Sequence, residues 1–169
     1  MKATFTLIES SNSSSTSYKV LDTISNSYLD VSGVVSAATQ NGVPCTKLRG
    51  SVSLTADFSI LNEMRCSAWV NLGSAFNGSS SLIGMGNVSV LDIVRDGSSN
   101  QLQVDSTVVG TLDDNAWSQL TAIVDDGKVF TYINTTKVSE VSLSSLVYTS
   151  LRFGDDDSNY FVRDVNVYI

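Results

Sequence analysis

The sequence predicts an all-β domain, either a sandwich or a barrel, and three observations lead to this prediction. The β-favouring runs Leu120 to Val124 and Val129 to Ile133 are joined by Asp125-Asp126-Gly127-Lys128, and an Asp-Gly turn between two such runs is a strong hairpin signal. No segment shows a sustained 3.6-residue period, and Ser, Thr and Val are more prominent than helix-favouring runs. Around a dozen short apolar runs separated by turn residues are typical of sandwiches and barrels.

The N-terminal part is the least regular. Thr4 to Ile8 predicts a first strand, and the polar run Ser10 to Ser17 predicts a loop or flexible arm. We therefore expect residues 1–17 to form a strand plus a Ser-rich arm, which either docks on a partner or completes the sandwich. Residues 18–29 fit a short helical turn and a strand equally well.

From Val31 onward, strand-like runs alternate with turns at Asn41-Gly42, around Asn77-Gly78 and at Asp96-Gly97. In the final run, Val165, Val167 and Ile169 share one face. Besides the hairpin, the predicted strands are Val31 to Val35, Cys45 to Leu48, Ser51 to Leu54, Phe58 to Leu61, Cys66 to Leu72, Leu82 to Met85, Ser89 to Arg95, Leu102 to Val104, Thr107 to Val109, Leu151 to Phe153 and Phe161 to Ile169. The sequence contains neither an internal repeat nor a linker, so residues 1–169 are predicted to form a single domain.

Composition excludes several functional classes. Of the 169 residues, 42% are hydrophobic and 16% are charged, which excludes a disordered chain. The net charge of −7, with basic residues scattered singly, argues against nucleic acid as a partner. Histidine is absent, so no Ser-His-Asp or Cys-His catalytic arrangement can form.

Cys66 lies within a predicted strand and is interpreted as a small buried thiol, while the spacing leaves a bridge to Cys45 undecided. The N-terminus lacks the apolar run of a signal peptide, and no run is long enough to cross a bilayer. We therefore expect no membrane insertion.

Five short motifs occur in a characteristic order: Ser67 to Val70, Ile83 to Gly86, the Trp117 to Asn134 hairpin, Leu151 to Gly154, and Val162 to Tyr168. In this order they resemble the concanavalin A-like jelly rolls, particularly the laminin-G-like and pentraxin-like branch, over roughly Cys45 to Ile169. The resemblance implies a two-sheet antiparallel β-sandwich. Three positions depart from the family pattern: Arg163 replaces an Asp, Thr135 replaces a Gly, and Gln119 stands where the family often has His.

The carboxylates do not suggest catalysis. Glycosidases of this superfold carry paired carboxylates along one strand, whereas Glu9, Glu63 and Glu140 stand alone. The Asp pairs at 113–114 and 125–126 fall in turns, where Asp is favoured for local hydrogen bonding. We expect the protein not to be an enzyme.

Asp155, Asp157 and Asn159 have the spacing of the first three ligands of an EF-hand loop, but the later positions of that motif fail. Because laminin-G-like domains often hold calcium on rim loops, the resemblance makes Asp155 and Asp157 candidate calcium ligands. A solvated acidic turn is the alternative interpretation.

For glycan binding, the sequence favours aromatic side chains in or beside loops, with amides nearby. Trp69 and Trp117 are predicted to lie in the core. The candidate ligand-binding residues are Phe76, Asn77, Tyr148, Asn159 and Tyr160.

Two functional hypotheses follow. The first is a non-catalytic structural or surface-display module, a viral (phage) decoration or fibre protein that contacts capsid or tail proteins and adheres to glycans. The alternative is a secreted carbohydrate-binding module or lectin, with calcium as its candidate cofactor. Both hypotheses predict a location on a virion or an extracellular surface.

Overall fold

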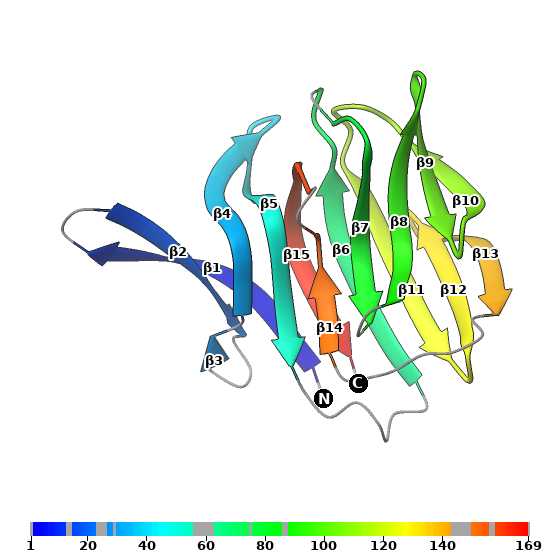
Figure 1. Cartoon of the computed structure of the whole chain (residues 1–169), viewed down its shortest axis with the longest axis horizontal. Coiled ribbons are helices and arrows are strands. Elements are labelled where there is room, and N and C mark those ends of the chain that lie inside the picture. The colour runs from blue at the N-terminus through cyan, green and yellow to red at the C-terminus, as the bar shows by residue number, and fades with distance from the viewer. Residues whose placement is uncertain are drawn as a thin grey trace.

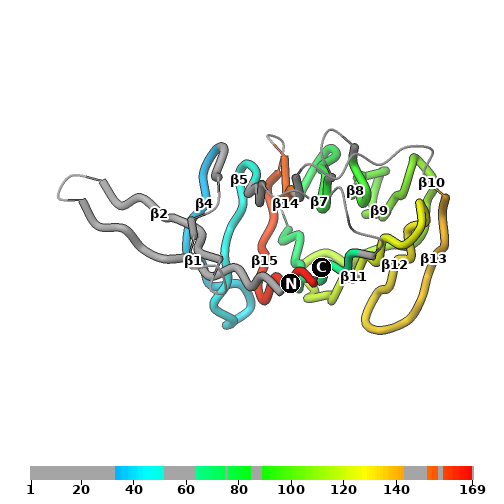
Figure 2. The backbone as a smooth tube through the Cα atoms, turned by 90° about the horizontal axis from the view of Figure 1, so that it is seen from below, coloured from blue at the N-terminus to red at the C-terminus, as the bar shows by residue number. Residues whose placement is uncertain are grey.

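The computed structural model describes the backbone of residues 2–12, 15–22, 27–28, 30–55, 63–74, 76–85, 88–142, 150–155 and 158–168, and the side chains of 33–51, 64–74, 76–84, 89–142, 152–155 and 158–168. These residues form fifteen strands and no helix, so none of them contributes a helix able to cross a membrane. Two antiparallel sheets of seven and five strands pack face to face, as Figure 2 shows from below. The predicted all-β sandwich is confirmed.

The order of strands in each sheet follows from the backbone pairing (Figure 1). The seven-stranded sheet contains, from one edge to the other, β4 (Asp30–Gln40), β5 (Val43–Thr55), β14 (Ser150–Phe153), β7 (Ser79–Met85), β8 (Val88–Asp96), β9 (Ser99–Val104) and β10 (Thr107–Leu112). The five-stranded sheet contains β15 (Tyr160–Tyr168), β6 (Glu63–Asn71), β11 (Ser118–Asp125), β12 (Lys128–Ile133) and β13 (Thr136–Ser142).

Strand β5 connects the two sheets. Its residues 46–48 pair with β15, and its residues 52–55 pair with β14. Between these segments, Gly50 faces Gly33 of β4, and Gly33 has a φ of 85°. A Cβ at Gly33 would lie 2.5 Å from the carbonyl oxygen of Arg49, so a side chain does not fit there. The two strands predicted at 45–48 and 51–54 are therefore one strand shared by both sheets.

The N-terminal segment is a β-hairpin rather than a loop. Strand β1 (Lys2–Asn12) pairs through residues 2–4 with β15 and through residues 5–12 with β2 (Ser15–Asp22), which is followed by β3 (Ser27–Tyr28). In Figure 1 this hairpin extends beyond the edge of the sandwich. The predicted loop or arm at Ser10 to Ser17 is thus wrong for residues 10–12 and 15–17, because each strand satisfies the backbone groups of the other. The strand predicted at Phe58 to Leu61 lies outside the described residues.

The hydrophobic core fills the space between the two sheets. Alternate residues of β6 and β11 supply one wall, and β8 and β9 supply much of the other, including fully buried Leu91, Ile93 and Leu102. The thiols of Cys45 and Cys66 are both free. Cys66 is completely buried, and this burial raises the pKa of its thiol. The interpretation of Cys66 as a buried core thiol is confirmed.

Candidate functional site

On the five-stranded sheet, alternate residues point away from the core and form what we call the outer face. In β6, Cys66, Ala68 and Val70 are buried in the core, so Arg65 and Trp69 point outward. The strand registers place the outward residues in three rows: Arg163–Trp69–Gln119, Asn166–Ser67–Thr121–Tyr132, and Tyr168–Arg65–Ile123–Phe130. The outer face therefore gathers aromatic rings, cations and amides from distant parts of the sequence.

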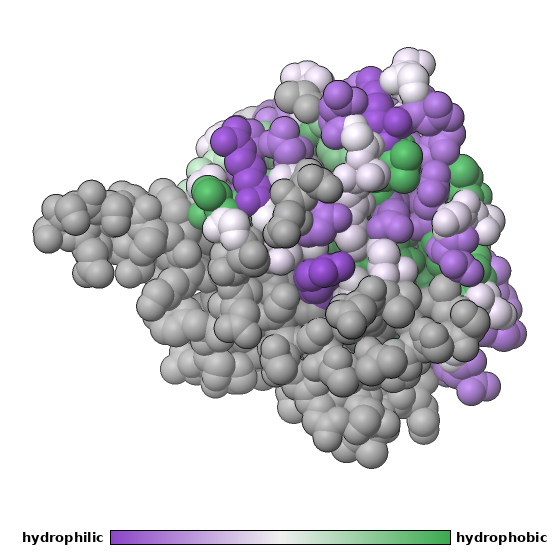
Figure 3. Space-filling view, viewed as in Figure 1, coloured by the Kyte–Doolittle hydropathy of each residue, from purple (hydrophilic) through white to green (hydrophobic). Residues whose placement is uncertain are grey.

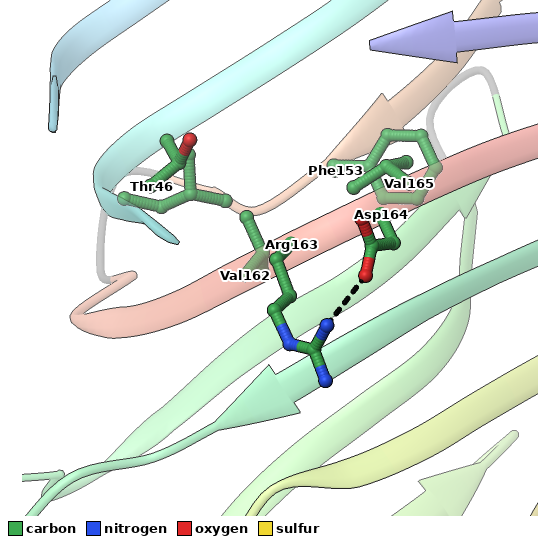
Figure 4. A pocket seen from close by; sticks show the side chains of 7 residues that line it. Thr46, Phe153, Val162, Arg163, Asp164 and Val165 are labelled. Carbon is green, nitrogen blue, oxygen red and sulfur yellow. Dashed lines mark hydrogen bonds and ion pairs between the residues drawn. The ribbon is translucent and has the colours of Figure 1, made fainter. Parts of the chain in front are cut away.

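Two tryptophans of the outer face share one guanidinium group. The central carbon of the Arg163 guanidinium lies 4.9 Å from the centre of the Trp69 ring and 5.3 Å from that of Trp117. A β-bulge follows Arg163, where Asp164 has a φ of 51°. Arg163 Nη1 donates a hydrogen bond of 2.7 Å to Asp164 Oδ2, drawn as a dashed line in Figure 4. Cation–π attraction and this ion pair together hold the guanidinium in place.

The prediction that Trp69 and Trp117 are core residues is wrong. Both are half-buried, and neither belongs to the core cluster. Strand alternation decides which face Trp69 occupies, whatever its size, and the inward positions beside it hold the smaller Ala68 and Val70. Trp117 lies just before β11, and its indole N–H donates to the carbonyl oxygen of Gln40 at 3.4 Å.

A hollow of about 270 Å³ opens on the outer face and is referred to below as the outer hollow. Its lining contains a phenol ring, a guanidinium, an amide, two hydroxyls and one aliphatic side chain, supplied by Tyr132, Arg65, Gln119, Thr121, Thr135 and Ile123. Asn134, which follows β12, is hydrogen-bonded twice to Gln119 beside the hollow. Its Oδ1 accepts from the Gln119 N–H at 2.8 Å, and its own N–H donates to the Gln119 carbonyl at 2.9 Å. Gln119 and Thr135 drew attention in the sequence only as departures from the family pattern.

A second hollow, of about 230 Å³, lies at the end of the sandwich. Its lining residues come from several loops and adjoining strand ends: Gln40, Lys47, Leu72, Gly73, Ser74, Asn115, Asn159 and Phe161. Lys47 Nζ lies 5.1 Å from the centre of the Phe161 ring, and Gln40 Nε2 donates to Asn115 Oδ1 at 3.4 Å. Of the predicted ligand-binding residues, Asn159 is therefore placed beside a hollow.

The other predicted ligand-binding residues are not brought together as an exposed cluster. Phe76 is 5% exposed and Tyr160 1% exposed, and both belong to the core, so their rings cannot stack on a sugar in this arrangement. Placing them at exposed loop positions was wrong, because both rings fill space between the sheets. Asn77 is exposed, and its Oδ1 accepts a local hydrogen bond from the Gly78 N–H at 3.0 Å. Tyr148 lies outside the described residues.

Asp155, the first predicted calcium ligand, is hydrogen-bonded within the protein. Its Oδ1 accepts from Ser80 Oγ at 3.0 Å and from Ser158 Oγ at 3.1 Å, and its Oδ2 accepts from the Ser81 N–H at 2.5 Å. Both carboxylate oxygens thus face hydrogen-bond donors of the protein. A calcium site instead needs oxygen atoms directed at the ion, so this arrangement is a poor fit to calcium. Asp157 lies outside the described residues, and the described part of the chain contains no cluster of three metal-ligating side chains.

A third cavity, of about 40 Å³, lies between β5, β14 and β15 and is shown in Figure 4. Leu48, Phe153, Val162 and Val165 supply most of its apolar lining. It is too small to hold a sugar, because about 40 Å³ has room for only a few water molecules.

The outward side of the seven-stranded sheet has a different character. Figure 3 shows this side, and its described side chains are mainly hydrophilic. Asp92 of β8 accepts a hydrogen bond from Ser89 Oγ, and partial burial raises the pKa of the Asp92 carboxyl. On β9, Gln103 Nε2 donates to Gln101 Oε1 at 3.3 Å, so these amides partly satisfy one another.

No protein-family model matches the sequence, and no curated protein matches it. Solved structures are similar in fold. The Trypanosoma rangeli sialidase in complex with a difluoro-nononic acid superposes with a TM-score of 0.64 at 14% identity, over 98% of this chain and 30% of the sialidase. The binding domain of botulinum neurotoxin DC in complex with SialylT gives 0.58 at 17% identity, over 98% of this chain and 47% of that one. Domain 4 of AbnA, an extracellular arabinanase from Geobacillus stearothermophilus in complex with arabinotriose, gives 0.57 at 18% identity, over 81% and 76% respectively.

The chain thus spans about a third of the sialidase and about half of the neurotoxin domain, but about three quarters of the arabinanase domain. At 14–18% identity, these similarities show the fold alone. They establish that the chain has the β-sandwich fold of these domains, which agrees with the two-sheet sandwich that the five sequence motifs implied.

Proposed function

We propose that this protein is a non-catalytic carbohydrate-binding module whose ligand binds at the outer hollow. The observation that carries the proposal is the set of side chains in this hollow. The Tyr132 ring can stack against the apolar face of a sugar, while Gln119, Thr121 and Thr135 offer the amide and hydroxyl groups that hydrogen-bond to sugar hydroxyls. A hollow of about 270 Å³ suits one or two sugar units rather than a long buried chain.

The similar structures support this proposal in part. The neurotoxin domain was solved with SialylT and the arabinanase domain with arabinotriose, so two proteins of this fold bind glycans. The finer placement in the laminin-G-like and pentraxin-like branch rests on sequence motifs such as Ile83 to Gly86, of which residues 83–85 lie at the end of β7. Assembly into a virion remains a prediction on which neither the outer hollow nor these structures bear.

The lining of the outer hollow also supports a binding role without catalysis. Glycoside hydrolysis generally requires two carboxyl groups on either side of the scissile bond. None of the residues that line this hollow carries a carboxyl group. We therefore expect a bound oligosaccharide to be released unchanged, and mass spectrometry of the ligand after long incubation checks this.

The test is a glycan array followed by titration calorimetry of the best ligands. Gln119→Ala is the informative variant, and Gln103→Ala is its matched control, because both glutamines are half-buried and belong to strands of opposite sheets. We expect Gln119→Ala to weaken binding by at least about tenfold, equivalent to roughly 1.4 kcal/mol, and Gln103→Ala to leave it unchanged. Absence of binding to any glycan, or equal losses in both variants, would refute the proposal.

A further inference from the structure

Building on the proposed function, we infer that the outer hollow selects a sugar that bears a carboxylate, and that Arg65 binds this carboxylate. Arg65 lies on β6 between Tyr168 of β15 and Ile123 of β11, and its exposed side chain lines the hollow. It is the single charged residue of the lining. The charge at this point is therefore positive, in a chain whose net charge is −7.

Arg65 differs from the other cations of the outer face in its lack of a carboxylate partner. Lys128 and Lys137 both form ion pairs with Glu140, at 3.0 and 2.9 Å, and Arg163 pairs with Asp164 at 2.7 Å. Within the described part of the chain, Arg65 forms no ion pair, and its recorded contact is with the Tyr168 ring, 6.0 Å from the ring centre. Its donors are thus available to a ligand.

The chemistry of Arg65 favours a carboxylate in particular. A guanidinium presents its N–H donors in a planar fork that matches the two oxygens of a carboxylate, and such charge-assisted pairs are stronger than neutral hydrogen bonds. Among the described side chains, the nearest outward carboxylate is that of Asp125, which belongs to the next row of the sheet. That row lies two residues, or about 7 Å, further along the strands, and none of the described carboxylates lines the hollow.

The remaining lining residues complete the recognition of an acidic sugar. Thr121 and Gln119 occupy β11, with Thr121 one row from Arg65 and Gln119 two rows away, while Tyr132 faces Thr121 from β12. A sugar ring stacked on Tyr132 would therefore have its carboxylate toward Arg65 and its hydroxyls toward the amide and hydroxyl groups. This arrangement distinguishes an acidic sugar from its neutral counterpart by one charged contact.

The experiment compares ligands that differ in the carboxylate. The probes are 3′-sialyllactose against lactose, oligogalacturonate against its methyl ester, and a sulfated galactan oligosaccharide as a non-planar anion. We expect at least one carboxylated probe to bind about tenfold or more tightly than its neutral counterpart. Arg65→Ala should abolish this preference, Arg65→Lys should retain part of it, and Arg49→Ala, an equal change of charge at an exposed residue of β5, should leave it intact.

The outcomes separate this inference from the proposed function. If neutral glycans bind as well as acidic ones and Arg65→Ala changes nothing, the inference is overturned while carbohydrate binding stands. A preference for the sulfated probe over both carboxylated probes also overturns it. If no glycan binds at all, both proposals fail. Near-ultraviolet circular dichroism of each variant verifies that a loss of binding is not a loss of fold, and if Arg65→Ala is misfolded, Arg65→Gln replaces it.

Discussion

On the outer face of the five-stranded sheet, neighbouring rows carry Trp69, Tyr132 and Phe130, whereas the equivalent outward positions of the seven-stranded sheet carry Asp92 and Gln103. The rows of the seven-stranded sheet are Ser81–Asp92–Gln103–Val108 and Ser79–Val94–Gln101–Thr111, without an aromatic ring. Both sheets direct aliphatic side chains into one shared core, so the core does not explain this difference.

The difference indicates where function is located. Polar side chains that hydrogen-bond to one another, such as Gln101 and Gln103, are typical of a sheet face that contacts only solvent. Clustered aromatic rings on a solvent-facing sheet contribute less to folding stability than they would in the core, because part of their surface stays in contact with water. Such patches commonly mark binding surfaces. The contrast also separates stability from binding: we expect substitutions around the seven-stranded sheet to affect folding, and substitutions at the outer hollow to affect ligand binding.

The largest effect is expected from Asp155→Ala, beside the first residues of β7. The substitution leaves the hydroxyls of Ser80 and Ser158 and the Ser81 N–H without their carboxylate acceptor. Because unsatisfied buried groups cost about 1–3 kcal/mol each, we expect a loss of about 3 kcal/mol in the free energy of unfolding, measured by urea denaturation.

Glycan affinity per folded molecule should be unchanged in Asp155→Ala, which distinguishes an anchoring role from a role in binding. The wild-type protein also provides a test of the calcium prediction. Since the carboxylate oxygens of Asp155 face hydrogen-bond donors, added calcium should leave the thermal midpoint where it is. A calcium-dependent rise in the thermal midpoint that is absent in Asp155→Ala would support the predicted calcium site. It would also give the region around the seven-stranded sheet a ligand of its own.

The second prediction concerns Tyr132 on the outer face. Tyr132→Ala should reduce glycan affinity by about tenfold, roughly 1.4 kcal/mol, because it removes the ring on which a sugar would stack. Tyr132→Phe should keep most of the affinity, since stacking needs the ring rather than the hydroxyl. Titration calorimetry measures both variants. Equal losses in Phe and Ala variants would assign the contact to the hydroxyl instead.

The third prediction concerns the guanidinium between the tryptophans. Arg163→Ala removes two cation–π contacts and the ion pair with Asp164, and we expect it to cost about 1–2 kcal/mol of stability in urea denaturation. Tryptophan fluorescence should also change, because both indoles lose the same charged neighbour. Arg163→Lys keeps a charge and serves as the control, with a smaller change expected. Unaltered fluorescence in Arg163→Ala would contradict the shared contact.

The sequence predicted the fold better than the site, and the reason is physical. The hairpin of β11 and β12 and the alternation of Val165 and Val167 are local patterns, which a sequence displays directly. The row Arg163–Trp69–Gln119 depends on the register between three strands that are distant in the sequence, and no local pattern encodes it. Tyr132 was assigned only to a strand, although its outward position was readable from the alternation beside it.

The assignments of aromatic residues failed for a related reason. Phe76 and Tyr160 were placed at exposed positions because they adjoin loops, yet each ring packs into the core. Trp69 was placed in the core because it lies inside a strand, yet β6 directs it outward. Proximity to a turn and a position within a strand are weaker guides to exposure than the face of the strand on which a residue lies.

The smallest expected effect is the pH dependence contributed by Asp92, on the polar side of the sandwich. Burial raises the pKa of this carboxyl in the folded state above its unfolded value of about 3.9. The folded state therefore holds its proton more tightly, so this contribution to stability is present below the unfolded pKa and is lost as pH rises through the folded pKa. Asp92→Asn should remove that loss, giving a flatter stability profile from pH 3 to pH 6 by urea denaturation, while glycan affinity stays unchanged. A steeper profile, or weakened binding, would mean that the polar face contributes more than a solvated surface does.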